Sequence, residues 1–179
     1  MSKIWITSDL HLGHDREFIW GARGYANVNE MNMKQIEKFN SVVSDEDEVW
    51  ILGDLVLGDI EGGLALLKQL KGKIHVCLGN HDTGKREQAY RDMGWDVQLC
   101  AKLKYKKLNF YLSHYPTITT NGEIESPFQV TWNTHGHTHS TNEWSEFPYC
   151  YNVNVDAHNG YPVSIDKIYI KILEGWRKL

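Results

Sequence analysis

Three histidines alternate with other residues in the stretch 132–140, which reads WNTHGHTHS. His135, His137 and His139 make up a third of the nine histidines in the chain. Residues two apart on an extended segment face the same side, and where the segment curves they can face different partners. Imidazole is a common metal ligand and also serves in proton transfer near neutral pH. The residue types elsewhere in the chain decide between these two chemistries.

Carboxylate, amide and imidazole side chains that suit a metal ion recur in four other short stretches. These are DLH (9–11), GD (53–54), GNHD (79–82) and His114. Asp9 and His11 have the same two-residue spacing, so both can reach one ion. Imidazole nitrogen together with carboxylate and amide oxygen binds borderline divalent metals, and Mn, Fe, Zn and Ni all fit this set. Three widely separated cysteines exclude a structural zinc site made of four cysteines.

Each of these stretches follows a segment whose hydrophobic pattern predicts a β-strand. In the first half the predicted elements alternate, with strands at 3–8, 48–52 and 73–78 and helices at 29–43, 61–72 and 84–94. The first helix has apolar residues at 33, 36, 39 and 43 and Asn29 as its predicted cap, and Gly72 is predicted to close the second. This alternation is typical of parallel strands joined by crossover helices.

The second half is predicted to be rich in strands, with no helix of comparable support. Its strand-like segments are 96–105, 108–114, 128–136, 150–156 and 164–172. Turn residues gather in the loops 119–127 and 156–162. The two halves together predict an α/β fold in which two sheets pack face to face with helices outside. We expect one domain that spans residues 1–179.

Five predicted strands would therefore carry Asp, Asn or His side chains at their C-terminal ends. That edge is where open α/β sheets bind ligands. Glycines at 53, 79 and 136 allow the backbone to turn sharply and approach closely beside a crowded site. Any one of these motifs is weak evidence alone, but five in this order, each at a strand end, indicate a metal site.

The composition narrows the classes of function. The 179 residues carry a formal net charge of −4, so the chain lacks the basic excess of general nucleic-acid binders. The one lysine-rich stretch, KLKYKK (102–107), is predicted to be a strand with exposed lysines rather than a basic patch. No apolar run approaches the ~18 residues of a membrane span, and the start has no signal-peptide pattern. With its unpaired cysteines the chain is expected to be cytoplasmic, without a membrane partner.

The ordered set DLH, GD, GNHD, H and GHTH, from Asp9 to His139, resembles the calcineurin-like metallophosphoesterase superfamily. The stretches 22–32, 40–54, 152–156 and 162–168 are similar to its small single-domain bacterial and phage members. The resemblance implies a four-layer αββα sandwich of two mixed β-sheets flanked by helices. The serine/threonine protein phosphatases of the superfamily carry GDxVDRG, whereas this chain has GDLVLGD (53–59), which argues against that activity.

The resemblance also implies two divalent transition-metal ions per chain, with Mn as the first candidate and Fe, Zn or Ni as alternatives. The first ion would be held by Asp9, His11, Asp54 and His139. The second would be held by Asp54, Asn80, His114 and His137. Asp54 would bridge the two ions, which in such pairs lie about 3.5–4 Å apart.

Two residues beside the implied ligands have catalytic roles in the resemblance. His81 resembles the family histidine that lies next to the phosphate and donates a proton to the leaving oxygen. Asp82 is grouped with it as a supporting residue behind the ligands. His135 precedes the GHTH motif and is expected to be packed or hydrogen-bonded inside its strand, with support of a ligand as the alternative.

Three further residues are candidates for substrate binding. They are His14, Arg23 and His158, and each has a structural or surface role as its alternative. The fork of the Arg23 guanidinium suits a phosphate clamp. His158, together with Tyr161, would line the pocket from the loop 156–162.

These residues predict a dinuclear metal-dependent phosphoester hydrolase, in the first instance a phosphodiesterase. A metal-bridging hydroxide would attack phosphorus in line, and His81 would assist the leaving alkoxide. Phosphomonoesterase activity and nuclease activity on DNA or RNA are the alternatives. The expected partner is a phosphoester substrate, with nucleotides and nucleic acids included. A non-catalytic scaffold is disfavoured because the set of ligands is intact, and the oligomeric state is open.

Overall fold

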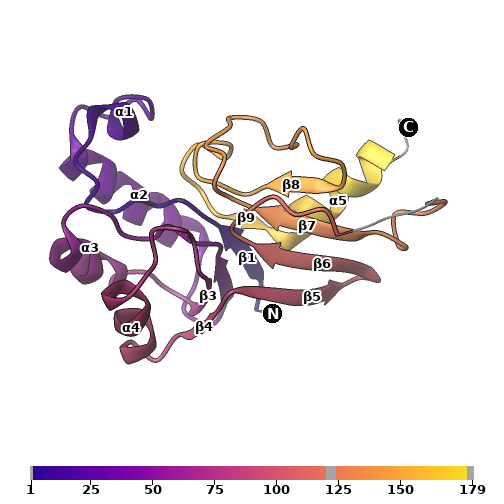
Figure 1. Ribbon diagram of the computed structural model, residues 1–179, viewed down its shortest axis with the longest axis horizontal. Helices are drawn as coiled ribbons and strands as arrows, with labels where there is room; N and C mark the ends of the chain where they lie inside the picture. Colours follow the sequence, from indigo (N-terminus) through magenta and orange to yellow (C-terminus); the bar gives the residue numbers. More distant parts are fainter. Residues whose placement is uncertain (1, 120–123, 177–179) are drawn as a thin grey trace.

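The computed structural model describes residues 2–119 and 124–176, which form two mixed β-sheets with flanking helices (Figure 1). The five-stranded sheet has the order β4-β3-β2-β1-β9, with β1 (Ile4–Thr7), β2 (Glu48–Ile51), β3 (Lys73–Cys77), β4 (Asp96–Gln98) and β9 (Val163–Ser164). The four-stranded sheet has the order β5-β6-β7-β8, with β5 (Cys100–Tyr105), β6 (Leu108–Ser113), β7 (Thr131–His135) and β8 (Cys150–Asn152). The predicted fold class is therefore confirmed.

Most neighbouring strands run parallel, which brings their C-terminal ends to one edge of each sheet. In the five-stranded sheet β1, β2, β3 and β4 are parallel, and β9 runs antiparallel to β1. In the four-stranded sheet β6, β7 and β8 are parallel, and β5 runs antiparallel to β6. The polar stretches that follow β1, β2, β3, β6 and β7 can therefore meet.

Three crossover helices cover the outer face of the five-stranded sheet (Figure 1). They are α2 (Val28–Val42), α3 (Ile60–Leu67) and α4 (Lys85–Asp92), and the short α1 (Glu17–Trp20) precedes them. Phe39, Leu67 and Tyr90 from these helices pack with Val49 and Val76 of the strands in one buried cluster. Burial of these apolar side chains, at about 25 cal/mol per Å², holds the helical layer on the sheet.

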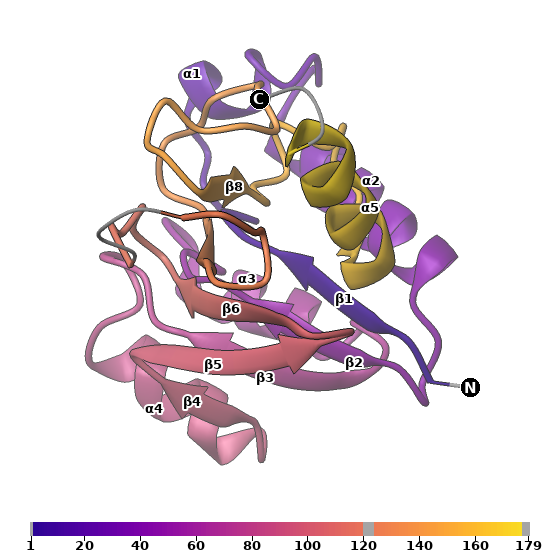
Figure 2. The ribbon, with the colours of Figure 1, turned by 90° about the vertical axis from the view of Figure 1, so that its right-hand side faces the viewer.

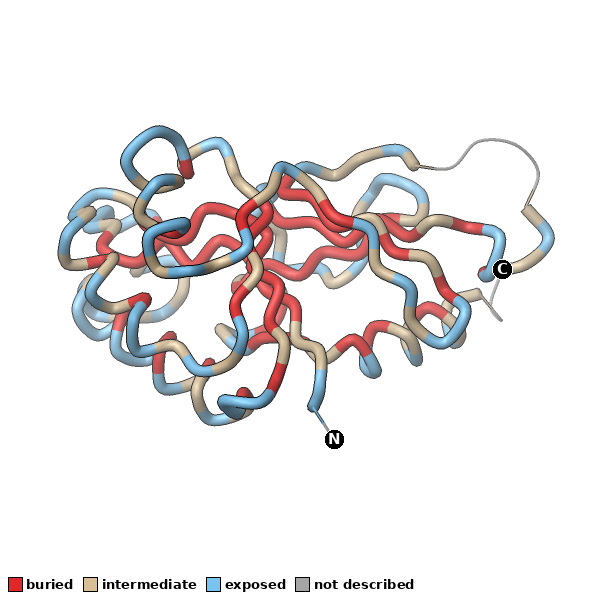
Figure 3. Tube along the Cα trace, turned by 90° about the horizontal axis from the view of Figure 1, so that it is seen from below, coloured by how far each residue is buried: buried red, intermediate tan, exposed pale blue. Residues whose placement is uncertain are grey.

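Figure 2 shows the ribbons of the two sheets, and a second buried cluster contains side chains from both of them. Ile6 and Trp50 of the five-stranded sheet share it with Phe110 and Trp132 of the four-stranded sheet. Side chains alternate between the two faces of a strand, so β2 gives Trp50 to this cluster and Val49 to the helical side. Figure 3 shows the buried segments running through the strands at the centre of the molecule, with the exposed segments in the surrounding loops.

The predicted strand at 164–172 is wrong, because most of this segment forms helix α5 (Ile165–Trp176). The residues in SIDKIYIKI alternate as a strand would, but Ile165, Ile168 and Ile172 also recur at helical spacing. These three isoleucines are buried in the second cluster. The sequence is compatible with both the two-residue spacing of a strand and the 3.6-residue spacing of a helix, and tertiary packing favours the helix.

Other boundaries also differ from the prediction. Helix α2 is capped by Asn27, not Asn29, because the Asn27 side chain accepts a hydrogen bond from the Glu30 N–H at 3.0 Å. Met33, expected on the buried face, is 70% exposed. Helix α3 begins after Asp59 and ends at Leu67, before Gly72.

The predicted strand 96–105 is two strands, β4 and β5, which belong to different sheets. Lys102 and Lys104 on β5 are exposed, as expected for the lysine-rich stretch. Of the predicted loop 119–127, residues 120–123 lie outside the described part of the chain. No helix within residues 2–119 and 124–176 is long and apolar enough to cross a membrane.

Candidate metal centre

The polar stretches at five strand ends converge on one cluster. Backbone hydrogen bonds tie the loops after β1 and β2 together, since Asp9 N–H donates to Gly53 O and His11 N–H to Asp54 O, both at 3.0 Å. The loops after β6 and β7 are joined by Gly136 N–H and His114 O at 3.0 Å. The seven residues expected to hold metal all have atoms in this cluster: Asp9, His11, Asp54, Asn80, His114, His137 and His139.

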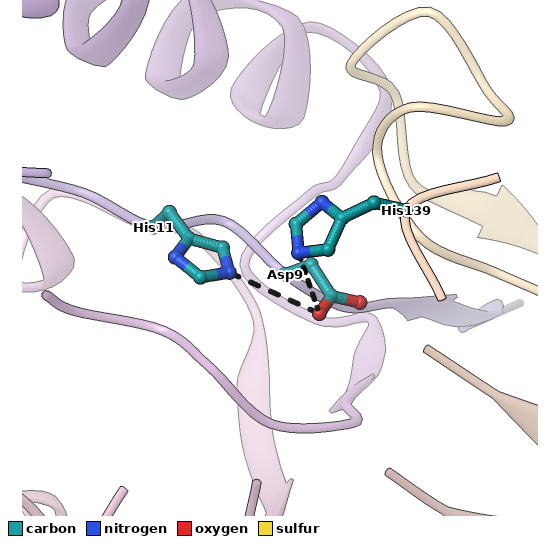
Figure 4. Close-up of side chains that lie close together, drawn as sticks. All are labelled: Asp9, His11 and His139. Carbon is teal, nitrogen blue, oxygen red and sulfur yellow. Dashed lines mark ion pairs between the residues drawn. The ribbon is translucent and has the colours of Figure 1, made fainter. Parts of the chain in front are cut away.

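One group of ligand atoms forms around Asp9 (Figure 4). His139 Nε2 lies 3.7 Å and His11 Nε2 lies 4.0 Å from Asp9 Oδ1. His11 Nε2 is also 3.8 Å from Asp54 Oδ2. This group contains the four residues expected at the first metal position.

A second group forms around His114 Nε2. This atom is 3.5 Å from Asp54 Oδ2, 2.9 Å from Asn80 Oδ1 and 3.2 Å from His137 Nδ1. His137 Nδ1 is itself 3.0 Å from Asn80 Oδ1. The same Asp54 oxygen therefore faces imidazoles of both groups, as a bridging carboxylate would.

The spacing and burial of these atoms fit divalent metal ions. Ligand atoms that each lie about 2.0–2.2 Å from one ion are separated from one another by about 3–4 Å. His11 Nε2 is buried and has no hydrogen-bond partner among the described residues. Asp9 is 0% exposed and Asp54 3% exposed, and a buried carboxylate that stays ionised is stabilised by nearby cations or hydrogen-bond donors. Burial raises the pKa of Asp9 and lowers the pKa of His11 to about 2, so the His11 imidazole is neutral near pH 7.

Backbone strain is concentrated at the same residues. Positive φ angles occur at Asp9 (58°), His11 (52°), Asp54 (55°), His137 (67°) and His139 (50°). Non-glycine residues adopt this left-handed region rarely, and it costs of the order of 1 kcal/mol or more each. Such strain persists at functional sites, because the surrounding structure holds the side chains in place.

Two glycines are required by the close approach of the aspartates. A Cβ at position 136 would collide with the carboxylate of Asp9 and the hydroxyl of Ser8. A Cβ at position 79 would collide with the carboxylate of Asp54 and would lie 2.7 Å from its backbone nitrogen. Any side chain at either position would therefore displace a candidate ligand, which explains the glycines in GNHD and GHTH.

Hydrogen bonds at the far side of two imidazoles aim their Nε2 atoms into the cluster. His114 Nδ1 donates to Leu52 O at 2.8 Å, and His139 Nδ1 donates to Asp156 Oδ2 at 2.8 Å. Metal-binding histidines commonly have such a partner, which fixes the tautomer and the ring orientation. The hydrogen bond to Asp156 also raises the pKa of His139, although burial opposes it.

Asp156 is a site residue that sequence reasoning did not assign. It follows β8 in the stretch NVNVD, which was noted only for its resemblance to family members. Burial alone would raise the pKa of Asp156, but hydrogen bonds from His139 and Arg23 lower it to about 2. A carboxylate kept ionised in a buried position requires such partners.

Arg23 does not have the geometry of a phosphate clamp. Its guanidinium donates to both carboxylate oxygens of Asp156 and to the carbonyls of Asp9 and Leu10, and its side chain is 7% exposed. The remaining N–H faces Met31 Sδ at 3.7 Å. All five N–H donors of the guanidinium are thus directed at protein groups. Arg23 therefore joins two loops of the protein and has no free donor for the phosphate of a substrate.

His81 lies at the edge of the cluster with a half-exposed side chain. Its Nε2 is 4.0 Å from Asp54 Oδ2, and the imidazole is 42% exposed. Its backbone N–H donates to Asp54 Oδ1 at 3.0 Å. Arg86 donates to the His81 carbonyl at 3.1 Å and anchors the loop. The imidazole is therefore available to a substrate beside the ligands.

Asp82, grouped with His81 in the prediction, points away from the cluster. Its carboxylate accepts hydrogen bonds from the N–H groups of Asp54 (2.5 Å), Gly79 (3.0 Å) and Leu55 (3.2 Å). It also accepts one from Tyr90 Oη at 2.8 Å. With 1% of its surface exposed, it has no access to substrate and instead holds the backbone of Asp54 in place.

Three of the remaining four histidines have a role predicted from the sequence, and they divide between the cluster and the interior. His14 stacks on His11, with ring centroids 5.3 Å apart, and its Nδ1 lies 3.2 Å from His11 Nδ1. His158 is 7% exposed, and its Nε2 donates to Asn152 O at 2.9 Å, which favours the structural role given above as its alternative. His135 is fully buried, and its Nδ1 donates to Gly136 O at 2.8 Å, in line with a packed histidine.

A hollow of about 580 Å³ opens over the first group of ligands. Four histidines line it: His11, His14, His81 and His139. Apolar side chains of Phe18, Ile19 and Ala22, from α1 and the residues after it, form one wall, and Leu57 adds to it. The expected lining residues His158 and Tyr161 are not among the described residues around it. The hollow is larger than a phosphate group and has an apolar side.

Comparisons with known proteins agree with this geometry. A family model described as calcineurin-like phosphoesterase matches residues 2–177. The uncharacterized protein MJ1445 of Methanocaldococcus jannaschii is 34% identical, over 97% of this chain and 93% of its own length. The Gene 66 protein of Mycobacterium phage L5 is 31% identical, over 94% of this chain and 93% of its own. A crystal structure of a protein of unknown function from Aquifex aeolicus shares the fold, with a TM-score of 0.68 and 23% identity over 94% of this chain and 98% of that one. The chain therefore belongs to the calcineurin-like phosphoesterase family and is a metal-dependent phosphoester hydrolase.

Proposed function

We propose that the protein is a phosphodiesterase that works with two divalent transition-metal ions, Mn²⁺ in the first instance. Asp9, His11, Asp54 and His139 would hold one ion, and Asp54, Asn80, His114 and His137 the other. When bound, such a pair of ions activates water for attack and stabilises charge on the phosphoryl oxygens. The position of Asp54 Oδ2, 3.8 Å from His11 Nε2 and 3.5 Å from His114 Nε2, supports a shared ligand.

The observation that carries the catalytic proposal is the imidazole of His81. It lines the hollow beside Asp54 but remains 42% exposed, with no side-chain hydrogen bond among the described residues. An unengaged imidazole next to the phosphorus position can give a proton to the oxygen that leaves. Asp82 and Arg86 would position His81 indirectly, since they hold the loop on both sides of it.

The lining of the hollow supports a diester rather than a monoester. A monoester is a dianion near neutral pH and benefits from cationic side chains that bind its extra charge. Among the described residues that line the hollow, Arg23 is the one that carries a fixed positive charge, and its donors are all used internally. A diester has one charge, and its second organic group would lie against the apolar wall of Phe18, Ile19 and Leu57.

The same lining supports a small diester over an extended nucleic acid. A nucleic-acid groove binds successive phosphates with lysine and arginine side chains. The formal net charge of −4 and the engaged guanidinium of Arg23 do not supply them. We further propose that residues 1–179 act as one domain and that the protein works in the cytoplasm, where Cys77, Cys100 and Cys150, which form no disulfide, would stay reduced.

A matrix of metals and substrates tests this proposal. Metal-free protein would be reloaded with Mn²⁺, Fe²⁺, Zn²⁺ or Ni²⁺ and assayed on an aryl phosphodiester, an aryl phosphomonoester, cyclic nucleotides and short oligonucleotides. We expect two ions per chain by elemental analysis and the highest kcat/KM on a diester. One ion or none would refute the dinuclear proposal. Faster monoester turnover, or oligonucleotide cleavage that falls steeply with salt, would replace the diesterase by one of the alternatives.

A further inference from the structure

A buried ion pair joins two loops that are far apart in the sequence and lie beside the first metal position. Arg23 Nε donates to Asp156 Oδ1 at 2.7 Å and Nη2 to Asp156 Oδ2 at 3.2 Å, across 133 residues of sequence. The side chains are 7% and 13% exposed. Two parallel hydrogen bonds of this type fix both the distance and the relative orientation of the groups.

Each end of the pair holds one of the candidate ligands. Arg23 Nη2 also donates to the carbonyl of Asp9 at 2.8 Å, and Nη1 donates to the carbonyl of Leu10 at 3.1 Å. These bonds hold the backbone where Asp9 has a φ of 58°. At the other end, Asp156 Oδ2 accepts a hydrogen bond from His139 Nδ1 at 2.8 Å, which turns His139 Nε2 toward Asp9 Oδ1.

Among the described residues, the second metal position has no buried ion pair of this kind; the Asp82 carboxylate instead accepts hydrogen bonds from the N–H groups of Asp54 and Gly79. The His114 imidazole is held by a backbone carbonyl, Leu52 O at 2.8 Å. Within the first position, His11 Nδ1 lies 3.2 Å from the ring nitrogen Nδ1 of His14. Among the described candidate ligands, His139 is thus the one whose imidazole donates to a carboxylate. A carboxylate partner orients the ring and makes it a stronger ligand.

We infer that the Arg23–Asp156 pair is a positioning device that sets the affinity of the first metal position separately from the second. The inference rests on the two metal positions proposed above. The donors of Arg23 and both carboxylate oxygens of Asp156 are engaged with protein groups, so the pair is placed to support the ligands rather than to bind an ion or the substrate itself. The pair acts through Asp9 and His139, because it fixes a strained backbone on one side and an imidazole ring on the other. Loss of the pair should therefore weaken one ion and spare the other.

Calorimetric titration of metal-free protein with Mn²⁺ tests this inference. Asp156→Asn keeps the shape of the side chain but removes its charge, and Arg23→Lys keeps the charge but loses the fork that binds Asp156, Asp9 and Leu10. In both variants we expect the affinity for one ion to fall by about 10–100-fold, with the other unchanged. Electron paramagnetic resonance on the same samples would show isolated ions where the wild type shows coupled pairs. This second readout remains clear even where the calorimetric steps overlap.

Asp166→Asn is the matched control. Asp166 also pairs with a basic side chain, Lys106 Nζ at 2.6 Å, but at the start of α5 and away from the ligand cluster. We expect its titration to match the wild type. If Asp156→Asn binds both ions as the wild type does, or loses both equally, the inference is wrong. A wild-type protein that binds fewer than two ions would instead refute the dinuclear proposal, and the inference with it.

Discussion

Replacement of His81 by alanine separates proton donation from metal binding. The Asp54 carboxylate is held by the backbone N–H of residue 81 at 3.0 Å, and alanine keeps that N–H. The imidazole is 42% exposed and has no side-chain hydrogen bond among the described residues, so its removal leaves no buried group unpaired. We expect His81→Ala to retain both metal ions and to change the free energy of unfolding by no more than about 0.5 kcal/mol.

The loss of kcat should depend on the leaving group. An alkoxide from an alkyl or ribose ester needs a proton as it departs. For that ester we expect a loss of about 10²–10⁴-fold, which corresponds to roughly 2.7–5.4 kcal/mol of transition-state stabilisation. A nitrophenolate departs without much proton help, so the same variant should lose less than about tenfold on a nitrophenyl diester.

The assay compares kcat on one alkyl and one nitrophenyl phosphodiester, with metal counted in the same samples. His114→Ala is the matched control, because His114 Nε2 lies within 3.5 Å of Asp54, Asn80 and His137. That variant should lose metal, and with it activity on both substrates. Equal losses on both substrates for His81→Ala, or a loss of metal, would show that His81 binds the ground-state phosphate or an ion instead of donating a proton.

Three other perturbations test separate parts of the structure. Asp54→Asn should reduce kcat/KM at least about tenfold more than His139→Ala does, because Asp54 is placed to contact both ions; equal losses would contradict the bridge. Phe18→Ala should lower kcat/KM by about five- to tenfold for diesters with a bulky apolar group and leave methyl esters unchanged, since Phe18 is 70% exposed at the hollow; a uniform effect would exclude this contact. Asp47→Asn should cost about 2–4 kcal/mol near neutral pH, because the Asp47 carboxylate accepts hydrogen bonds from Lys3 N, Trp5 Nε1 and Ser44. Burial would raise the pKa of Asp47, but these hydrogen bonds lower it below its unfolded value. In urea unfolding, the wild type should therefore exceed Asp47→Asn in stability by the full amount above pH ~4, and this difference should shrink as the pH falls further. A difference that does not change with pH would contradict this.

The elements with a single strong periodicity could be predicted from the sequence. The strands 3–8, 48–52 and 73–78 each end in a polar motif, and the structure places β1, β2 and β3 within those ranges. The segment 164–172 could not be decided locally, because its isoleucines satisfy both strand and helix spacing. A local pattern favours Asn27 over Asn29 as the cap of α2, since Asn27 precedes Glu30 by three residues.

The ligand cluster was more predictable than its supports. Its members are Asp, Asn and His residues in short motifs at strand ends. Because the strands are parallel, their C-terminal ends lie together, so the pattern of strands alone predicts that these residues meet. Arg23 and Asp156 act through a contact across 133 residues, which no local pattern encodes. The exposure of His81 and the burial of His158 likewise depend on how the loops pack.

The pairing of β9 with β1 has a consequence for synthesis of the chain. Trp5 and Ile6 form their outer strand pairing with Ser164 and Val163, so one edge of β1 stays open until residues 163 and 164 have been made. At about 5–20 residues per second, roughly 8–30 s pass between the two segments. An open, apolar strand edge invites pairing with other chains during that interval. The short β9 thus covers the open edge of β1 late in synthesis. Nascent chains that have not yet formed β9 should depend on chaperones to avoid aggregation.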